Sequence, residues 1–393
     1  MTPEEARAQF DVVAQGLCSR WPTKAELTDA LMRALHEATG GAVRFSGVGG
    51  RDMTEAGLRS LFPLGDLAIV GITSIPRRLP QLLRRIRETA DAAIAAQPDV
   101  LVIIDSPEFT HRVARRVRAK APEMLIVDYV CPSVWAWRPW RARAMRRYVD
   151  HVLALLPFEP KALRELGGPP ASFVGHPIAD RVAEIRPDAT EATRREAPPP
   201  VLLVMPGSRS GELNFMLPVF GETVTRLQRS IPDIDVAVLA VPHLARRVRA
   251  AVTTWPVPVR VLVEPGERNE AMRTARAALV KSGTGTLELA VAGVPMVAAY
   301  KVGRVEEMVA RLLIRTSSFI LANLVLGERA VPELLQGDCT SDKLAAALLP
   351  LLRETPDRQA QLAAFARLDT IMQIGTPSPS RSAAARVLAL AKA

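Results

Sequence analysis

The sequence of 393 residues predicts an α/β fold with two doubly wound parallel sheets. Short runs rich in valine, isoleucine and leucine alternate with longer segments in which apolar residues recur at helical spacing. Because most of these runs are apolar throughout, they are typical of strands buried on both faces of a parallel sheet. A polar segment at residues 184–200, which ends in three prolines, divides the pattern into two similar halves.

Each half contains several strand-like runs. They are Val43–Gly47, Leu67–Ile72, Val100–Asp105, Met124–Tyr129 and Val152–Leu156 in the first half, and Val201–Met205, Val236–Val241, Val259–Val263, Ala277–Lys281 and Val294–Tyr300 in the second. Helical spacing predicts helices at residues 79–94, 110–120, 211–229, 268–276 and 286–292. Strand and helix in strict alternation indicate βαβ units.

This pattern predicts the domain organisation. We expect an N-terminal domain at residues 1–183, a linker at 184–200, a C-terminal domain at 201–355 and a helical tail at 356–393. The sequence leaves open whether this tail packs back on the N-terminal domain. Ligands of open α/β sheets bind at the carboxyl ends of the strands. The two domains are therefore expected to face a cleft at these ends.

The charge distribution indicates an anionic partner. The formal net charge is +10, and residues 71–148 carry 15 basic and 7 acidic residues, a net charge of +8. Such a stretch suits nucleic acid, anionic lipid or a phosphorylated substrate, although biased codon usage alone would also enrich arginine. No motif typical of nucleic-acid binding occurs, so we expect no nucleic-acid partner.

Other classes of protein are disfavoured by composition. No run approaches the ~18 uncharged apolar residues that a membrane-spanning helix needs. The N-terminus lacks the apolar segment of a signal peptide, so we expect none. Cys18, Cys131 and Cys339 are too scattered for a disulfide framework or a metal cluster, which fits a reducing cytoplasm.

The first candidate site is the turn after Val201–Met205, where Gly207, Ser208 and Arg209 lead into a helix. Glycine permits close backbone approach, Ser208 is suited to cap the helix, and free N–H groups at a helix start favour an anion. Arg209 can add a bidentate phosphate contact. The alternative is an ordinary strand-to-helix turn with a surface arginine.

The second candidate site follows Ala277–Lys281. Ser282, Gly283 and Thr284 offer hydroxyl and N–H groups to a diphosphate, and Glu288 is placed to accept hydrogen bonds from ribose hydroxyls. The lysine precedes the glycines, so this is not a Walker A loop. The alternative is a Gly/Ser-rich turn with Glu288 stabilising the helix dipole. Two such loops in one half favour a nucleotide-diphosphate site.

Carboxylates follow a very apolar strand in the first half. Asp105 ends Val100–Asp105, and Glu108 lies close behind it. A carboxylate at a strand end is suited to accept a proton. The favoured alternative is a helix cap, because Pro107 suits the first helical position.

Aromatic residues and arginines cluster after the next strand. Trp135, Trp137 and Arg138 suit sugar stacking, phosphate binding or a membrane interface, or simply pack between helices. His176, in a Gly-His-Pro turn, either touches a phosphate, acts as an acid or serves as a structural turn residue.

In order and with normal spacing, the segments FSGVGGRDM, IDSPEF, YVCPSVWAWR, LLPFEP, FVGHP, MPGSR and KSGTGTLELA resemble the lipid-A-disaccharide synthase family from about residue 30 to about residue 355. The resemblance implies a GT-B glycosyltransferase with two Rossmann-like domains. It implies transfer of 2,3-diacylglucosamine from its UDP-sugar to 2,3-diacylglucosamine 1-phosphate (lipid X), an inverting reaction of Gram-negative lipopolysaccharide synthesis. It also implies no metal or other cofactor, a homodimer, and a peripheral enzyme on the cytoplasmic face of the inner membrane.

The resemblance also implies roles for residues. Asp105 becomes the candidate general base, or the group that orients the acceptor. Arg209 and residues 282–284 would hold the diphosphate, and Glu288 the ribose. Asn323 matches the family's Pro-Asn element, although Ala322 replaces the proline. The basic stretch at 71–148 would face anionic lipid and the acceptor phosphate.

One segment departs from the family pattern. The family opens with a strand that ends in a loop of the type A-G-E-x-S-G-D, and an ungapped count places that loop on residues 19–25, SRWPTKA. Both glycines and both carboxylates are missing, and residues 10–27 do not form a clean strand–turn–helix pattern. Phe10–Ala14 is the only strand-like part. The alternative function is therefore a degenerate member that binds UDP or lipid without turnover.

Overall fold

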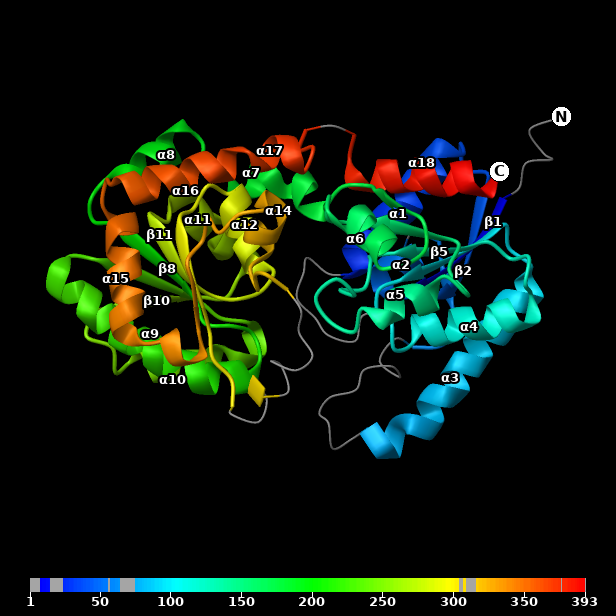
Figure 1. The fold of residues 1–393 in the computed structure, drawn as a ribbon, viewed down its shortest axis with the longest axis horizontal. Helices are drawn as coiled ribbons and strands as arrows, with labels where there is room; N and C mark the ends of the chain where they lie inside the picture. Colours follow the sequence, from blue (N-terminus) through cyan, green and yellow to red (C-terminus); the bar gives the residue numbers. More distant parts are fainter. Residues whose placement is uncertain are drawn as a thin grey trace. The chain divides into compact units, whose positions relative to one another are not determined.

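The computed structural model describes residues 8–14, 24–55, 57–63, 75–303, 307–308, 316–375 and 377–392. The chain forms two compact units, coloured by sequence in Figure 1. The N-terminal unit comprises Met1–Pro177 and Gly375–Ala393, and the C-terminal unit comprises Ile178–Ile374. None of the helices in these described ranges is long and apolar enough to cross a membrane.

The N-terminal unit is built on a parallel sheet with the order β3-β2-β1-β4-β5-β6-β7. Its strands are β1 (Ala8–Ala14), β2 (Val43–Val48), β3 (Arg59–Ser60), β4 (Val100–Ile104), β5 (Ile126–Tyr129), β6 (His151–Ala154) and β7 (Ala171–Phe173). Its helices are α1 (Lys24–Ala38), α2 (Arg51–Glu55), α3 (Ile75–Ala96), α4 (Thr110–Lys120), α5 (Trp140–Met145), α6 (Glu159–Glu165) and α18 (Pro379–Ala391).

Strand β4 explains why an unbroken apolar run predicts a sheet covered on both sides. Leu101 and Ile103 belong to one core cluster with residues of α3 and α4, whereas Val102 and Ile104 belong to another with residues of α1 and α18. Successive side chains of a strand point to opposite faces. Every residue of β4 is therefore buried.

The first strand and helix correct the sequence analysis. Strand β1 is a central strand, paired with β2 on one side and β4 on the other, and α1 follows at Lys24. A strand and a helix therefore do form here. Residues 15–23, which include most of the departing loop, lie outside the described residues, as does the predicted strand Leu67–Ile72.

The C-terminal unit contains a parallel sheet with the order β10-β9-β8-β11-β12-β13. Its strands are β8 (Val201–Met205), β9 (Asp235–Leu239), β10 (Val259–Leu262), β11 (Ala277–Lys281), β12 (Met296–Tyr300) and β13 (Glu333–Leu335). Its helices are α7 (Val182–Ile185), α8 (Ala189–Glu196), α9 (Ser210–Ser230), α10 (Ala245–Val252), α11 (Pro265–Thr274), α12 (Gly285–Val291), α14 (Leu321–Leu326), α15 (Ser341–Leu352), α16 (Pro356–Ala366) and α17 (Leu368–Ile371).

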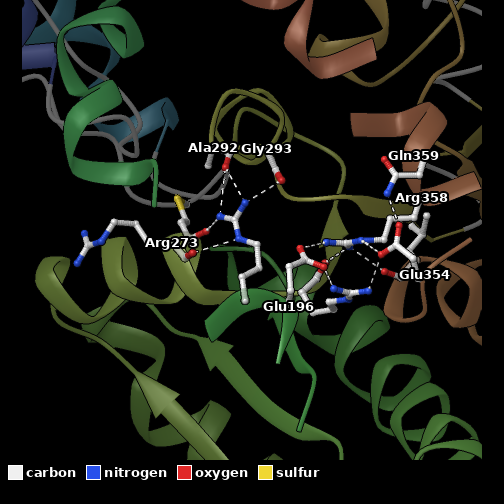
Figure 2. A network of polar contacts seen from close by, with 11 residues as sticks. Glu196, Arg273, Ala292, Gly293, Glu354, Arg358 and Gln359 are labelled. Carbon is white, nitrogen blue, oxygen red and sulfur yellow. Dashed lines mark hydrogen bonds and ion pairs between the residues drawn. The ribbon is translucent and has the colours of Figure 1, made fainter. Parts of the chain in front are cut away.

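Residues 184–200 are not an extended linker. They contribute to α7 and form α8, and both helices pack on α11 within the C-terminal unit. The guanidinium of Arg195 donates hydrogen bonds to the carbonyl oxygens of Arg273, Ala292 and Gly293, which are labelled in Figure 2, and to that of Met272. This arginine satisfies carbonyl groups in the last turn of α11 and directly after α12. A polar composition therefore concealed a packed segment.

The tail is divided between the units. Helix α16 belongs to the C-terminal unit, where the buried Arg358 pairs with Glu196 at 2.6 Å and donates to the carbonyl of Arg276 (Figure 2). Only residues 375–393 belong to the N-terminal unit, where α18 packs along α1. The expected domain boundaries therefore shift to Pro177/Ile178 and Ile374/Gly375.

Candidate functional site

Two loops of the C-terminal unit leave the same edge of its sheet. Strands β8 and β11 are parallel neighbours, with Met205 opposite Val280. The turn at Pro206–Arg209 and the turn at Ser282–Thr284 follow these strands directly. The structure therefore brings together the two loops that the sequence singles out for a diphosphate.

The first loop is organised by Glu212, which the sequence analysis missed. Its carboxylate accepts hydrogen bonds from the backbone N–H groups of Ser208 at 2.9 Å and Arg209 at 3.1 Å. Ser208 does not cap α9, because the carboxylate takes that position. Gly207 has φ = +109°, and a Cβ there would lie 2.5 Å from Glu212 Oε2. The glycine is therefore required by both the backbone conformation and the buried carboxylate.

Lys281 connects this loop to the second. Its ammonium lies 3.2 Å from Glu212 Oε1 and 4.7 Å from the ring centre of Tyr300. Burial raises the pKa of Glu212, but Lys281 and the N–H donors of Ser208 and Arg209 outweigh burial and hold the pKa below its ordinary value. A glutamate three residues after Arg209, at a helix start, is the sequence signal for this cap.

The second loop is tightly held. Ser282 is buried, and its hydroxyl donates to the carbonyl of Phe319 at 2.8 Å. The hydroxyl of Thr286 donates to the carbonyl of Gly283 at 2.7 Å. A Cβ on Gly285 would lie 2.8 Å from the Met205 methyl group, so α12 starts in close contact with β8. Gly283 and Thr284 thus present their backbone from a fixed turn.

Glu288 is buried in α12 and is paired with two arginines. Arg268 donates to one carboxylate oxygen, and Arg181 lies 3.4 Å from the other. A ribose would therefore share this carboxylate with guanidinium groups that are already in place.

Asn323, in α14, is also buried and hydrogen-bonded. Its amide nitrogen donates to the Val331 carbonyl and to Glu333 Oε1, both at 2.9 Å, and its oxygen accepts from the Val331 N–H at 2.8 Å. Direct contact with a nucleotide would require this amide to share or release one of these partners.

In the N-terminal unit, strained backbone gathers where β4 and β5 end. Asp105, Ser106 and Val130 have φ values of +49°, +45° and +85°. Such values are costly for residues other than glycine, above all for a β-branched valine, and they concentrate at functional sites. Asp105 Oδ1 accepts a hydrogen bond from the Ser106 N–H at 2.6 Å. Strand pairing places Asp105 beside the end of β5, where its N–H donates to the Tyr129 carbonyl at 3.1 Å.

Glu159, a second residue that the sequence analysis did not single out, holds Trp135 in place. Glu159 Oε1 accepts from Trp135 Nε1 at 3.1 Å, and Oε2 accepts from the N–H groups of Leu155 at 3.0 Å and Leu156 at 2.9 Å. The Trp135 ring meets Phe158 edge-on, with centroids 5.0 Å apart. Burial raises the pKa of Glu159 to about 7, against the opposing effect of these donors.

The remaining candidates differ in exposure. Arg138 stacks over the exposed ring of Trp137, with 4.1 Å from its guanidinium carbon to the ring centroid. Glu108 is exposed and pairs with Arg141 at 3.0 Å. His176 is buried, and burial lowers its pKa to about 3. A buried neutral histidine fits the structural interpretation better than a general acid.

Comparison with known proteins decides the family. The sequence profile of a family described as lipid-A-disaccharide synthetase matches residues 25–386. The chain belongs to this family. The lipid-A-disaccharide synthase of Nitrobacter hamburgensis is 59% identical over 362 residues, which cover 92% of this chain and 91% of the relative. The lipid-A-disaccharide synthase of Rhodospirillum centenum is 44% identical over 370 residues, covering 93% of this chain and 92% of the relative.

Solved structures agree on the fold of this lipid-A-disaccharide synthase family member. UDP-GlcNAc 2-epimerase from Neisseria meningitidis, bound to UDP-GlcNAc, has a TM-score of 0.60 at 13% identity and covers 97% of this chain and 100% of its own. MurG from Acinetobacter baumannii has a TM-score of 0.57 at 13% identity, covering 97% of this chain and 99% of its own. The fold is the GT-B fold with two parallel-sheet domains, as the sequence predicts.

Proposed function

We propose that this chain is an inverting glycosyltransferase that joins UDP-2,3-diacylglucosamine to lipid X and releases UDP and lipid A disaccharide 1-phosphate. Family membership over residues 25–386 carries this proposal. The paired loops after β8 and β11 support it, because they supply the kind of site that a nucleotide diphosphate needs.

The reaction requires a base and a stabilised leaving group. The acceptor 6-hydroxyl attacks the anomeric carbon, its proton passes to a base, and the bond from that carbon to the diphosphate oxygen breaks with inversion. Asp105 is the proposed base, because it is half-buried at a strained strand end. Proton acceptance by a positioned carboxylate contributes about 10²–10⁴ in rate.

The C-terminal unit would bind the donor nucleotide. Arg209 has an exposed side chain that pairs with Glu212 at 3.3 Å and would also reach a diphosphate, while Gly207, Ser208 and residues 282–284 shape the turns beneath it. Positive charge there would stabilise the departing diphosphate. Glu288 and Asn323 are the proposed ribose and uridine contacts, through oxygen or nitrogen atoms that they share with the partners described above.

The N-terminal unit is the proposed acceptor and membrane side. Leu61, Leu79, Leu83 and Trp140 are exposed at 46%, 41%, 39% and 62%, and arginines accompany the leucines on the exposed face of α3. Exposed apolar residues among basic ones suit an anionic bilayer surface. We therefore expect peripheral binding at the cytoplasmic face of the inner membrane.

Vesicle sedimentation tests this surface. Replacing Leu79 and Leu83 together by serine should lower binding to vesicles containing phosphatidylglycerol, because about 0.8 kcal/mol is lost per buried methylene. Serine at the exposed Ala95 of the same helix is the matched control. Equal binding of the Leu79/Leu83 variant and the control would refute the assignment. Sedimentation equilibrium tests the expected homodimer.

UDP release, measured with and without lipid X, tests the reaction. The wild type should release UDP only with the acceptor. Asp105→Asn should lower turnover at least about 100-fold while leaving UDP affinity unchanged, and the exposed Glu123→Gln is the control. UDP binding without acceptor-dependent release by the wild type would favour the degenerate alternative, for which the family comparisons give no support.

A further inference from the structure

We propose that Glu212 is a positioning residue for nucleotide binding: it joins the two loops after β8 and β11 and holds the cationic groups of Arg209 and Lys281 toward a diphosphate. This inference rests on the proposed function. It concerns a residue that the sequence motifs do not single out and that the reaction itself does not use.

The same cap occurs three times in the described residues. Glu159, Glu212 and Glu267 each lie near the start of a helix that follows a strand, and each accepts backbone N–H groups from the residues three and four positions earlier. The recurring pattern shows what a helix start alone requires of such a glutamate.

Glu267 shows the cap in its simplest form. Its carboxylate accepts from the N–H groups of Val263 at 2.9 Å and Glu264 at 3.1 Å, on an exposed surface at the start of α11. These distances match those of Glu212 to Ser208 and Arg209, 2.9 and 3.1 Å. Local capping of the helix therefore does not explain why Glu212 has further partners.

Glu212 differs by being nearly enclosed and by reaching a second loop. Its side chain is 9% exposed, and its Oε1 lies 3.2 Å from Lys281 and 3.3 Å from the Arg209 guanidinium. Lys281 ends β11, immediately before Ser282. One carboxylate thereby fixes the backbone of the first loop, the side chain of Arg209 and the residue that begins the second loop.

Charge and geometry then define how a diphosphate is bound here. The N–H groups of Ser208 and Arg209 are occupied by Glu212, so they are not the donors that hold the phosphate. Two cations beside one carboxylate leave one excess positive charge at this edge. Holding two long cationic side chains in place lowers the conformational entropy that binding would otherwise cost.

The opposite role for Glu212 would be to block a phosphate position, and the two roles predict different changes in UDP affinity. If Glu212 merely occupied a phosphate position, its removal would free two N–H donors, remove a negative charge and tighten UDP binding. A positioning role predicts the reverse, because Arg209 and Lys281 lose their common anchor.

Calorimetric titration of the full chain with UDP, and separately with uridine, decides between these roles. We expect Glu212→Ala to raise the UDP Kd roughly tenfold, the change that about 1.4 kcal/mol produces, and to leave the uridine Kd within about twofold. Glu212→Gln keeps the shape and one acceptor but turns an amide toward Lys281, so it should give a smaller loss. Glu267→Ala, which removes the matching cap, should leave both Kd values unchanged.

The titrations distinguish failure of the positioning role from failure of the proposed nucleotide site. Unchanged or tighter UDP binding in both Glu212 variants would overturn the positioning role, and so would equal weakening of UDP and uridine. If Glu212→Ala does not fold, Glu212→Gln gives the decision, with its melting temperature as the check. Failure of the wild type to bind UDP would instead refute the proposed nucleotide site.

Discussion

Glu159→Gln should change how the stability of this protein depends on pH. The Glu159 carboxylate is 4% exposed and accepts from Trp135 Nε1 and from the N–H groups of Leu155 and Leu156. Burial raises its pKa from 4.5 to about 7. Burial therefore outweighs the stabilisation of the ionised form by its donors.

The direction of the effect follows from proton binding. Between pH 4.5 and about 7 the folded protein binds more protons at this site than the unfolded chain does, so the wild type loses stability as pH rises. The stabilisation from Glu159 is fully present below its pKa in the unfolded chain, 4.5. It is lost as the pH rises through its pKa in the folded protein, about 7. A shift from 4.5 to about 7 corresponds to about 3 kcal/mol, of which about 2–3 kcal/mol falls between pH 5 and 8.

Glutamine removes this titration and also one of the two acceptor oxygens. At pH 5 we expect Glu159→Gln to be less stable than the wild type, because its amide faces a buried donor at a cost of about 1–3 kcal/mol. Between pH 5 and 8 the difference in unfolding free energy should shift by about 2–3 kcal/mol in favour of the variant, because only the wild type loses stability at this site as the pH rises. Urea unfolding followed by tryptophan fluorescence at several pH values measures this difference.

The exposed Glu165→Gln, on the same helix, is the matched control and should show the pH dependence of the wild type. A stability difference between wild type and Glu159→Gln that is constant from pH 5 to 8 would refute the reasoning, and so would a difference that grows with pH.

Further predictions concern the C-terminal unit. Arg195→Met should lower the free energy of unfolding by about 3 kcal/mol or more, because buried carbonyls lose a charged donor; thermal unfolding checks this, and a loss no larger than that of Arg195→Lys would contradict it. Gly207→Ala should cost about 1–3 kcal/mol through its positive φ and weaken UDP binding by displacing Glu212, which titration measures; wild-type affinity would show that the loop tolerates the change. Asn323→Ala should cost about 1–3 kcal/mol by leaving the backbone of Val331 unpaired, and an unchanged urea midpoint would show that water replaces the amide.

Much of the fold is readable from local sequence. Strands β8 and β11 and helix α4 have the predicted bounds, because unbroken apolar runs and regular helical spacing are local consequences of burial. The candidate turns follow these strands and so could be located as well. The short strands β3, β7 and β13 were missed, because two or three residues carry too little pattern.

Segments whose neighbours are distant in sequence were harder to predict. Residues 184–200 have a linker's composition, yet Arg195 donates to carbonyls in α11 and just after α12, and Glu196 pairs with Arg358 of α16. A polar composition suggests an exposed segment, but it does not reveal hydrogen-bond partners that lie far away in the sequence. Likewise β1 is central only because β2 and β4 pair with it.

By itself, the sequence determined the α/β class, the two halves, the family and the turns that could hold a diphosphate, because each depends on residue type and spacing along the chain. Only the tertiary structure decided which polar side chains already have hydrogen-bond or ion-pair partners within the protein. It turned Asn323 and Glu288 into buried, paired side chains and gave Glu159 and Glu212 their links between loops. Those links join residues brought together by neighbouring strands, and strand order is not written in any local pattern.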